Sequence, residues 1–303
     1  MAISRHQLVK ELEPGLNALF GLEYKRYENQ HAEIYTTESS DRAFEEEVML
    51  SGFANAQVKG EGSGVSFDEA QETYTARYTH ETVALAFAIT EEAIEDNLYD
   101  RLASRYTKAL ARSMSNAKQV KSVEPLINGL PSTDAFDSGD GVSLFNTAHP
   151  TVAGTFANTL ATQADLNETS LEQSLIDIAA MTDERGLRIA ARGVKMIIPS
   201  ELQFTAERLM KSQGRTVTAD NDVNAIVSMG MVPQGYRVNN YLTDSDAFYI
   251  LTDVPNGMKM FNRAPLTTAM EGDFDTGNVR YKARERYSFG VSDPRGIFGV
   301  EGS

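Results

Sequence analysis

The sequence has no cysteine and no tryptophan among its 303 residues. Without cysteine there is no disulfide, no thiolate nucleophile and no thiolate metal ligand, so stability must come from packing or from partner subunits. No run approaches the roughly 18 apolar residues of a membrane helix, and the start MAISRHQLVKELEP lacks a signal-peptide apolar region and cleavage site. We therefore expect a protein that is made and stays in a cytoplasm, without a membrane partner.

Positive charge is also scarce. Lys and Arg number 28 against 43 Asp and Glu, which gives a net charge of −15. Such a surface repels nucleic-acid phosphates, and this disfavours a sequence-specific DNA-binding protein. By contrast, the 12 Tyr and 14 Phe residues suit sheet faces and subunit contacts, which weakly favours assembly.

Motifs for catalysis or ligand binding are weak. The glycines of KGEGSGV precede a strand, not the helix of a dinucleotide loop, and indicate a flexible hairpin tip. The aspartates of DAFDSGDG lack calcium-loop spacing, so we interpret this segment as a surface turn. The histidines have neither metal-site nor catalytic-triad spacing, and we interpret His149, before Pro150, as structural. We expect no catalytic residue, cofactor or metal, although a dispersed active site stays open.

The N-terminal region predicts an arm that docks on another surface. Leucines at helical spacing between residues 4 and 22 indicate an amphipathic helix, with Ser4 as a possible cap. Pro14 and Gly15 interrupt that pattern, so we expect the helix to be broken there. Residues 24–41 are polar and patternless, and we expect extended chain.

Residues 44–89 predict a long β-hairpin. FEEEVMLSGFANAQV leads to a tip, KGEGSGVSFDEAQ, and ETYTARYTHETVALAFAI returns with alternating apolar positions. A returning arm of about 18 residues at about 3.3 Å each would reach roughly 60 Å, beyond the radius of a compact domain of this size. A two-stranded ribbon is marginal in water, so we expect it to lie on a neighbouring molecule.

A long helix follows directly, from Thr90 to about residue 122, and we expect Pro125 to end it. Apolar residues recur along it at helical spacing: Ile94, Leu98, Leu102, Tyr106, Leu110, Met114 and Ala117. Acidic residues fill its first part and basic residues the rest, an order that matches the helix dipole. The ordinary interpretation is a solvated face. The alternative is that each end meets opposite charge on an adjacent subunit.

The remaining sequence predicts mixed helices and strands. We expect a helix over residues 168–183, a strand VKMIIP leading to a helix SELQFTAERLMKS capped by Ser200, and a buried strand FYILTD. A long alternating strand, NVRYKARERYSFGV, precedes the closing GIFGVE. Since βαβ periodicity is absent, the predicted fold class is α+β.

The order of these elements resembles the major capsid protein of tailed bacteriophages, with the Hong Kong 97 type fold. The segments FAITEEAIEDNLYDRLASRYTKALARS, DGVSLFNTAHP and VKMIIPSELQFTAERLM are similar to the Mu-like major head subunit group or a relative. The resemblance implies five parts, in chain order: an N-terminal arm (1–42), an extended loop lying across the adjacent subunit (43–88), a peripheral domain with the spine helix (89–194), an axial domain (195–262) and a return to the peripheral domain (263–303).

The same resemblance implies a structural protein, not an enzyme, that self-assembles into hexamers and pentamers of an icosahedral head enclosing double-stranded DNA without sequence-specific binding. It implies a scaffolding protein, a portal and a possible decoration protein as partners, with assembly in the host cytoplasm and a final place in the virion capsid. Because the sequence starts at the arm, we expect a separate scaffold or a mature chain. An encapsulin-type nanocompartment shell is the nearest alternative, and a soluble α+β enzyme is a more distant one.

We expect subunit contacts at charged and aromatic residues of the hairpin and the long helix. The candidates are Lys59, Glu61, Phe67, Arg77, Glu91, Glu92, Arg101, Arg105 and Arg112. Some relatives join a loop lysine covalently to a neighbouring subunit, but the ordinary interpretation of Lys59 is a solvated side chain. We therefore predict noncovalent assembly.

Overall fold

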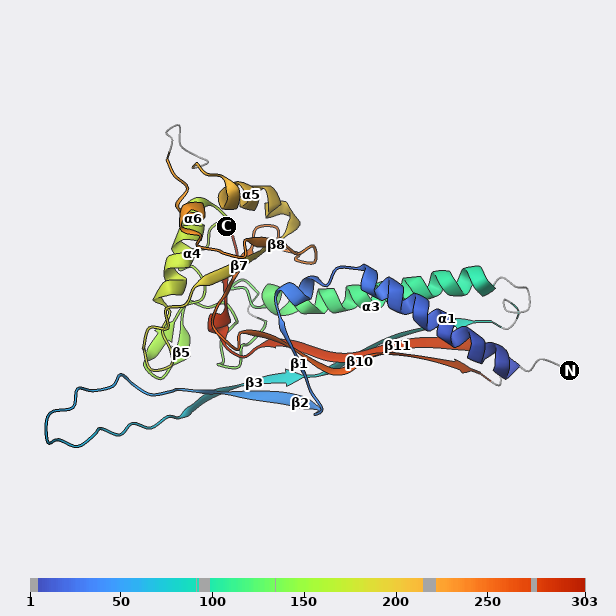
Figure 1. Cartoon of the computed structure of the whole chain (residues 1–303), viewed down its shortest axis with the longest axis horizontal. Helices are drawn as coiled ribbons and strands as arrows, with labels where there is room; N and C mark the ends of the chain where they lie inside the picture. Colours follow the sequence, from blue (N-terminus) through green and yellow to red (C-terminus); the bar gives the residue numbers. More distant parts are fainter. Residues whose placement is uncertain are drawn as a thin grey trace.

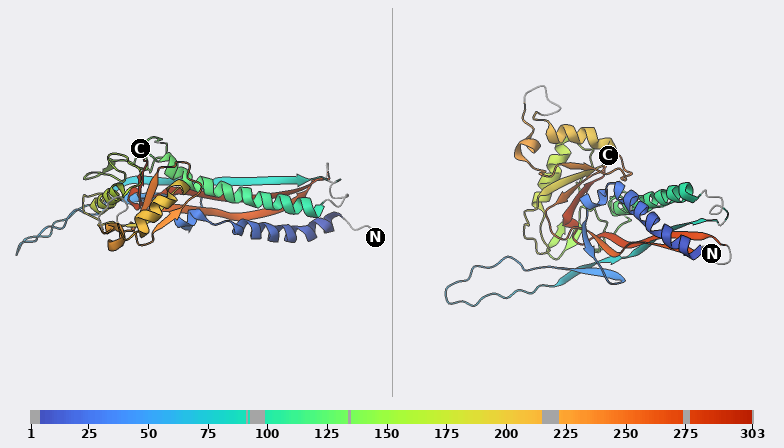
Figure 2. Two further views of the ribbon diagram at one scale, coloured as in Figure 1. Left: turned by 90° about the horizontal axis from the view of Figure 1, so that it is seen from above. Right: turned by 45° about the vertical axis from the view of Figure 1, so that its right-hand side comes forward.

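A computed structural model describes residues 5–90, 92, 99–133, 135–214, 222–273 and 277–302. The chain forms an elongated sheet covered on one face by two long helices, a compact unit at one end of that sheet, and a hairpin that projects beyond the compact unit (Figure 1). The two views in Figure 2 show the same separation of these parts. This arrangement agrees with the predicted α+β class.

The long sheet has the order β1 (Thr36–Ser39), β10 (Met258–Gly272), β11 (Val279–Val291) and β4 (Glu81–Ile89). The pairs β10–β11 and β11–β4 are antiparallel, whereas β1 lies parallel to β10. Burial alternates along the first half of β11, as expected for a strand with one face towards a core.

The N-terminal helix α1 (Arg5–Arg26) is continuous, so the predicted break at Pro14 and Gly15 is wrong. Leu16 and Phe20 are buried in a cluster with residues of α3 (Tyr99–Asn128) and β11. A proline costs one helical hydrogen bond, but most helical stability in proteins comes from tertiary packing of an apolar face. That packing explains why the helix passes through Pro14.

The long helix α3 also continues past its proline, and the predicted end at Pro125 is wrong. Val123 and Leu126 flank the proline and are both buried in the core, which holds the last turn in place. The helix stops at Asn128, before Gly129, whose added Cβ would lie 2.6 Å from Leu144 Cβ. The sequence predicts that this helix starts directly after Thr90. Residue 91 and residues 93–98 lie outside the described residues, so a direct junction between strand and helix stays a prediction.

The hairpin is shorter than predicted. β2 (Phe44–Leu50) pairs with β3 (Glu72–Thr79), but the strand is interrupted at His80, and β4 beyond it pairs with β11 instead. The two ring nitrogens of His80 each lie 2.9 Å from a serine hydroxyl, that of Ser40 and that of Ser288. Alternation identifies a strand but not its partner, so the expected 18-residue arm was two strands of different sheets.

The compact unit contains a second sheet in the order β12 (Ile297–Val300), β9 (Phe248–Thr252), β7 (Gly193–Ile198) and β8 (Tyr236–Val238). Helix α4 (Glu168–Ala180) contributes Leu171, Leu175 and Ile178 to its core. The range predicted as an axial domain, 195–262, thus shares its sheet with β12 and its core with α4, both outside that range.

The smaller elements complete the chain. They are η1 (Gln30–Glu33), β5 (His149–Thr151), β6 (Gly154–Phe156), η2 (Ser200–Leu202), α5 (Gln203–Lys211), α6 (Ala225–Met229) and η3 (Pro294–Gly296). Ser200 starts η2 and does not cap α5, contrary to the prediction, because the 3₁₀ turn separates it from that helix. Among the described helices, none has the length and apolarity needed to cross a membrane.

Candidate functional site

The hairpin tip, residues 51–71 between β2 and β3, is the most exposed part of the described chain and carries apolar side chains in water. Val58 is 100% exposed and Phe67 is 97% exposed. Phe53 and Val65 are also mostly exposed, and the tip reaches well past the compact unit (Figure 1). Exposed apolar side chains concentrated on one projecting segment indicate a surface that binds another molecule.

The base of the tip is held by its own hydrogen bonds. Ser51 N–H donates to the Gln71 carbonyl at 2.9 Å, and Gln71 N–H donates to Ser51 Oγ at 3.0 Å. Asp68 accepts from the backbone N–H groups of Ala54 and Glu69, and these bonds lower the pKa of its carboxyl group. The tip is therefore kept open as a loop by polar contacts, without a core of its own.

The root of the hairpin is fixed to the long sheet by Tyr78. Its ring meets Phe261 edge-on at 4.7 Å, and its hydroxyl lies 2.5 Å from Ser292 Oγ. A Cβ atom at Gly290 would stand 2.6 Å from this ring, so only glycine allows the close approach. Burial raises the pKa of the Tyr78 hydroxyl, which stays neutral.

A lysine joins the hairpin to two strands of the long sheet. Lys259 Nζ of β10 lies 2.6 Å from Glu47 Oε1 of β2 and 3.2 Å from Glu38 Oε1 of β1. Burial alone would lower the pKa of Lys259, but the hydrogen bonds that it donates to Glu47 and Glu38 raise it overall. The side chain is therefore charged, and the root is a rigid base from which the tip projects.

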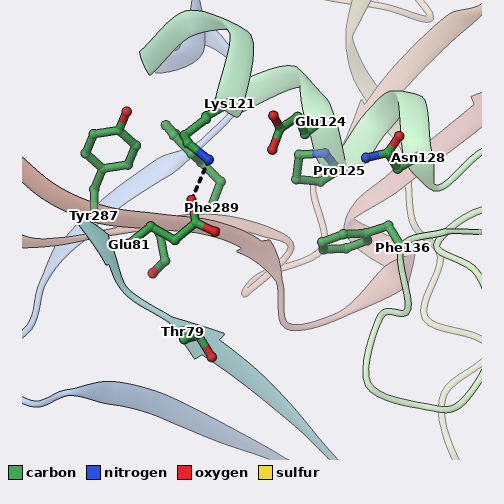
Figure 3. A pocket seen from close by; sticks show the side chains of 10 residues that line it. Thr79, Glu81, Lys121, Glu124, Pro125, Asn128, Phe136, Tyr287 and Phe289 are labelled. Carbon is green, nitrogen blue, oxygen red and sulfur yellow. Dashed lines mark hydrogen bonds and ion pairs between the residues drawn. The ribbon is translucent and has the colours of Figure 1, made fainter. Parts of the chain in front are cut away.

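A pocket of about 180 Å³ lies between this root and the end of α3 (Figure 3). Glu81 of β4 and Lys121 of α3 form an ion pair at the pocket, and the hydrogen bond with Glu81 raises the pKa of Lys121. Glu124 and Asn128 face the same space from the helix. The ion pair ties β4 to α3 at the edge of this pocket.

Histidine and carboxylate residues elsewhere have structural partners. His149 is fully buried, with Nδ1 2.6 Å from Asp140 Oδ2 and Nε2 3.0 Å from Asn158 Oδ1. Asp137 Oδ1 accepts from the N–H groups of Gly139 and Gly141, as in a turn. Within the described ranges, no group of three or more such residues has a metal-binding arrangement.

The predicted contact residues fall at two separate places. Lys59, Glu61 and Phe67 lie at the exposed tip, whereas Arg77 lies at the root, over the Phe44 ring at 4.1 Å and 3.7 Å from Glu46. The structure does not bring them near the residues predicted on the long helix.

On the helix side, Glu92, Arg105 and Arg112 are exposed, and the latter two have no ion pair with any described residue. Arg101 lies on α3, but its side chain and the whole of Glu91 are outside the described residues. Basic residues further along α3 use acids of their own chain: Lys118 pairs with Glu285, and Lys121 with Glu81.

Sequence reasoning missed the residues that anchor the hairpin: Tyr74, Tyr78, Lys259 and Ser292. The alternation over Tyr74, Ala76, Tyr78 and His80 marked a buried face of the strand, and that was the only available signal. Ser292 is 214 residues away from Tyr78, so no local pattern joins them.

Comparisons with known proteins agree on one class. The family model described as phage capsid protein matches residues 73–300, while no curated protein matches the sequence. A virus-like particle from Pyrococcus furiosus has a similar structure, with 10% identity and a TM-score of 0.55 over 95% of this chain and 98% of that chain. The capsid of Myoviridae phage XM1 has 13% identity and a TM-score of 0.54, covering 89% of both chains. The capsid of an empty GTA particle has 13% identity and a TM-score of 0.53, covering 90% of this chain and 89% of that chain. At such identities the structural likeness shows a shared fold.

Proposed function

The chain belongs to the phage capsid protein family and is a structural major capsid protein, and from this premise we propose that its hairpin lies on a neighbouring copy and links the subunits of an icosahedral phage head. The observation that carries this proposal is the tip. Its apolar side chains, with Val58 and Phe67 almost wholly exposed, stand beyond the reach of the chain's own core. Only another molecule can cover them, and in a shell the nearest molecule is an identical subunit.

We propose hexamers and pentamers as the repeating units, assembled in the host cytoplasm around a scaffolding protein, with a portal and a possible decoration protein added. The finished shell would enclose double-stranded DNA without reading its sequence. The net charge of −15 supports a wall to which packaged DNA does not adhere. The assignment to the Mu-like group rests on the local sequence similarity alone.

The proposed division of labour rests on the resemblance in the order of the elements. Residues 1–42 form the arm, of which α1 packs on α3 and the long sheet. We propose that α3 and the long sheet, apart from β1 of the arm, belong to the peripheral domain, and that β7, β8 and β9 belong to the axial domain. Within the hairpin, Lys59, Glu61 and Phe67 are the proposed contacts with the neighbour, and Arg77 stiffens the root through Phe44 and Glu46. Glu92, Arg101, Arg105 and Arg112 are proposed contacts on the helix, as is Glu91.

An encapsulin-type shell is the second candidate, because the virus-like particle from Pyrococcus furiosus shares the fold across nearly both chains. The two candidates differ in their contents. Nuclease-protected DNA inside purified particles supports a phage head, whereas a co-purifying cargo enzyme supports a nanocompartment.

Deletion of residues 56–70 tests the proposed role of the hairpin. The tip has no buried core, so the deletion should leave the circular dichroism spectrum and the thermal unfolding of the subunit unchanged. Particles should disappear from electron micrographs and from light scattering. Normal particles from the deleted chain would refute the role of the hairpin.

A paired substitution separates the loss of apolar contacts from a change in loop length. Val58→Asn with Phe67→Asn should weaken assembly like the deletion, because it removes the exposed apolar surface of the tip. Phe204→Asn on α5 is the matched control, since Phe204 is 70% exposed at a distance from the hairpin, and particles should persist.

A further inference from the structure

The long sheet has one face under the helices and one face opposite them. On the opposite face, β3 of the same chain covers only the part of β11 near the compact unit: Tyr78 lies against Gly290, and His80 bonds to Ser288. Both of these β11 positions are even-numbered, and even-numbered residues of this strand share that face. The strand continues away from the hairpin, and the rest of this face carries no other element of the described chain (Figure 1).

Four basic residues continue the same row on β11. Arg280, Lys282, Arg284 and Arg286 occupy the next even positions, and the first three are exposed while their odd-numbered neighbours are buried. We call these four residues the cation row. In a chain with a net charge of −15, four consecutive cations on one strand face are a concentrated exception.

The strands on both sides of the cation row present small, neutral residues. Directly opposite residues in antiparallel strands lie on the same face. On β4 these partners of the row are Ala88, Ala86, Ala84 and Thr82. On β10 they include Ala269, opposite Lys282, and Thr267, opposite Arg284. The cations therefore rise above small side chains on both flanking strands, and an extended segment could lie alongside them.

Acids of the same chain neutralise only one end of the row. Arg280 forms an ion pair with Asp273 and lies opposite Glu271. Lys282 and Arg284 have no ion pair with any described residue, and Nε of Arg286 is buried without a hydrogen-bond partner. The middle of the cation row thus carries uncompensated positive charge.

The hairpin has the complementary charge. Between residues 51 and 72 the acids are Glu61, Asp68, Glu69 and Glu72, against Lys59 as the only cation. Asp68 lies 3.8 Å from Arg185 of its own chain, which leaves Glu61, Glu69 and Glu72 for another partner. The hairpin and the free part of the long sheet extend in opposite directions from the compact unit (Figure 1). The tip of one copy therefore cannot meet its own cation row, whereas it can meet that of a second copy.

We propose that the cation row of one subunit, centred on Lys282 and Arg284, receives the acidic hairpin tip of a second copy of this chain. The neighbour's hairpin would continue along the face that β3 already covers in its own subunit. Electrostatic attraction fixes orientation and speeds the encounter, while Val58 and Phe67 supply apolar contact. This inference rests on the proposed function, since it names the surface on which the hairpin lies.

Charge reversal tests the pairing. Lys282→Glu with Arg284→Glu should raise the protein concentration needed for particles at least tenfold, as should Glu61→Lys with Glu69→Lys on the tip. A single chain with all four substitutions should recover particles at a lower concentration than either pair alone. Arg188→Glu with Arg192→Glu, on exposed arginines of the compact unit, is the charge-matched control and should assemble normally.

The outcomes separate the two levels of the proposal. Wild-type protein that forms no particles under any condition overturns the proposed function itself. If the wild type forms particles and the Lys282→Glu, Arg284→Glu chain assembles equally well, the pairing alone is overturned. It is also overturned if the chain with all four substitutions does not recover assembly. Normal particles with reduced packaged DNA would show that the row contacts nucleic acid and would also overturn it. If the chain with Lys282→Glu and Arg284→Glu does not fold, Lys282→Ala with Arg284→Ala replaces it, because alanine matches the flanking residues of β4. This variant should raise the protein concentration needed for particles at least threefold.

Discussion

The attachment of α1 and α3 to the long sheet depends on a buried ion pair, and its removal gives a measurable prediction. Lys118 Nζ of α3 lies 3.2 Å from Glu285 Oε2 of β11, and the Glu285 side chain is only 2% exposed. Tyr24 of α1 donates its hydroxyl to the same carboxylate at 3.3 Å. One carboxylate therefore joins three elements that are far apart in the sequence.

Lys118→Met should lower the free energy of unfolding by about 3–5 kcal/mol, because it leaves a buried carboxylate without its countercharge. Lys121→Met is the matched control on the same helix. Its partner Glu81 is 60% exposed, so the loss there should be under about 1 kcal/mol. Urea unfolding followed by circular dichroism, at concentrations where light scattering shows monomer, measures both losses.

The pH dependence gives an independent check. Burial raises the pKa of Glu285 in the folded chain, even with Lys118 beside it. Between the unfolded and the folded pKa the folded chain binds more protons, so this group's contribution to stability falls as pH rises. Without Lys118 the folded pKa rises further, so the Lys118→Met variant should lose more stability at pH 8 than at pH 5. Equal losses in the Lys118→Met and Lys121→Met variants, or no pH dependence of the difference, would refute this account.

Three further outcomes follow from buried contacts. Gly290→Ala places Cβ 2.6 Å from the Tyr78 ring, and this overpacking should cost about 1–3 kcal/mol of stability. It should loosen the hairpin root, seen as faster amide exchange over β3. Gly64→Ala at the tip is the control: its Cβ meets nothing within 4 Å, so neither stability nor amide exchange should change. Gly296→Ala would bring Cβ to 2.3 Å from Gly257 Cα. Because the atoms it would meet are backbone and cannot rotate away, we expect a larger loss of stability than for Gly290→Ala, seen as a lower melting temperature. Burial lowers the pKa of His31 to about 4, so the unfolded chain binds more protons than the folded chain between pH 6.5 and 4. The free energy of unfolding should therefore drop by about 3 kcal/mol as pH falls through that window. A His31→Leu chain should lack this part of the pH dependence of stability, and the same pH dependence in both chains would contradict the assignment.

Local patterns predicted the individual elements well and their ends less well. The periodicity of α4, β7, β9 and β11 was enough to place each of them. The two prolines in helices misled the prediction, since Pro14 and Pro125 are tolerated where buried neighbours hold the helix. Those neighbours come from distant segments, so the tolerance could not be predicted locally.

The candidate site was predicted in part. The glycine-rich tip, its acids and Phe67 were evident from composition, and so was the polarity of the long helix. The cation row is visible as alternate basic residues in VRYKARER, but its meaning depends on which face of the sheet they occupy. That face became known only when Tyr281 and Glu285 were seen buried under the helices.

By itself, the sequence determined the long helices, the strands β7, β9 and β11, the acidic composition and the flexible tip, because these follow from residue type and spacing over a few turns of chain. It did not predict β1 or β10 of the long sheet. Only the tertiary structure decided that the 72–89 stretch divides at His80 between two sheets, and that Tyr78 meets Ser292. Strand pairing is set by contacts between segments hundreds of residues apart, and a period-two pattern is the same whichever partner a strand takes.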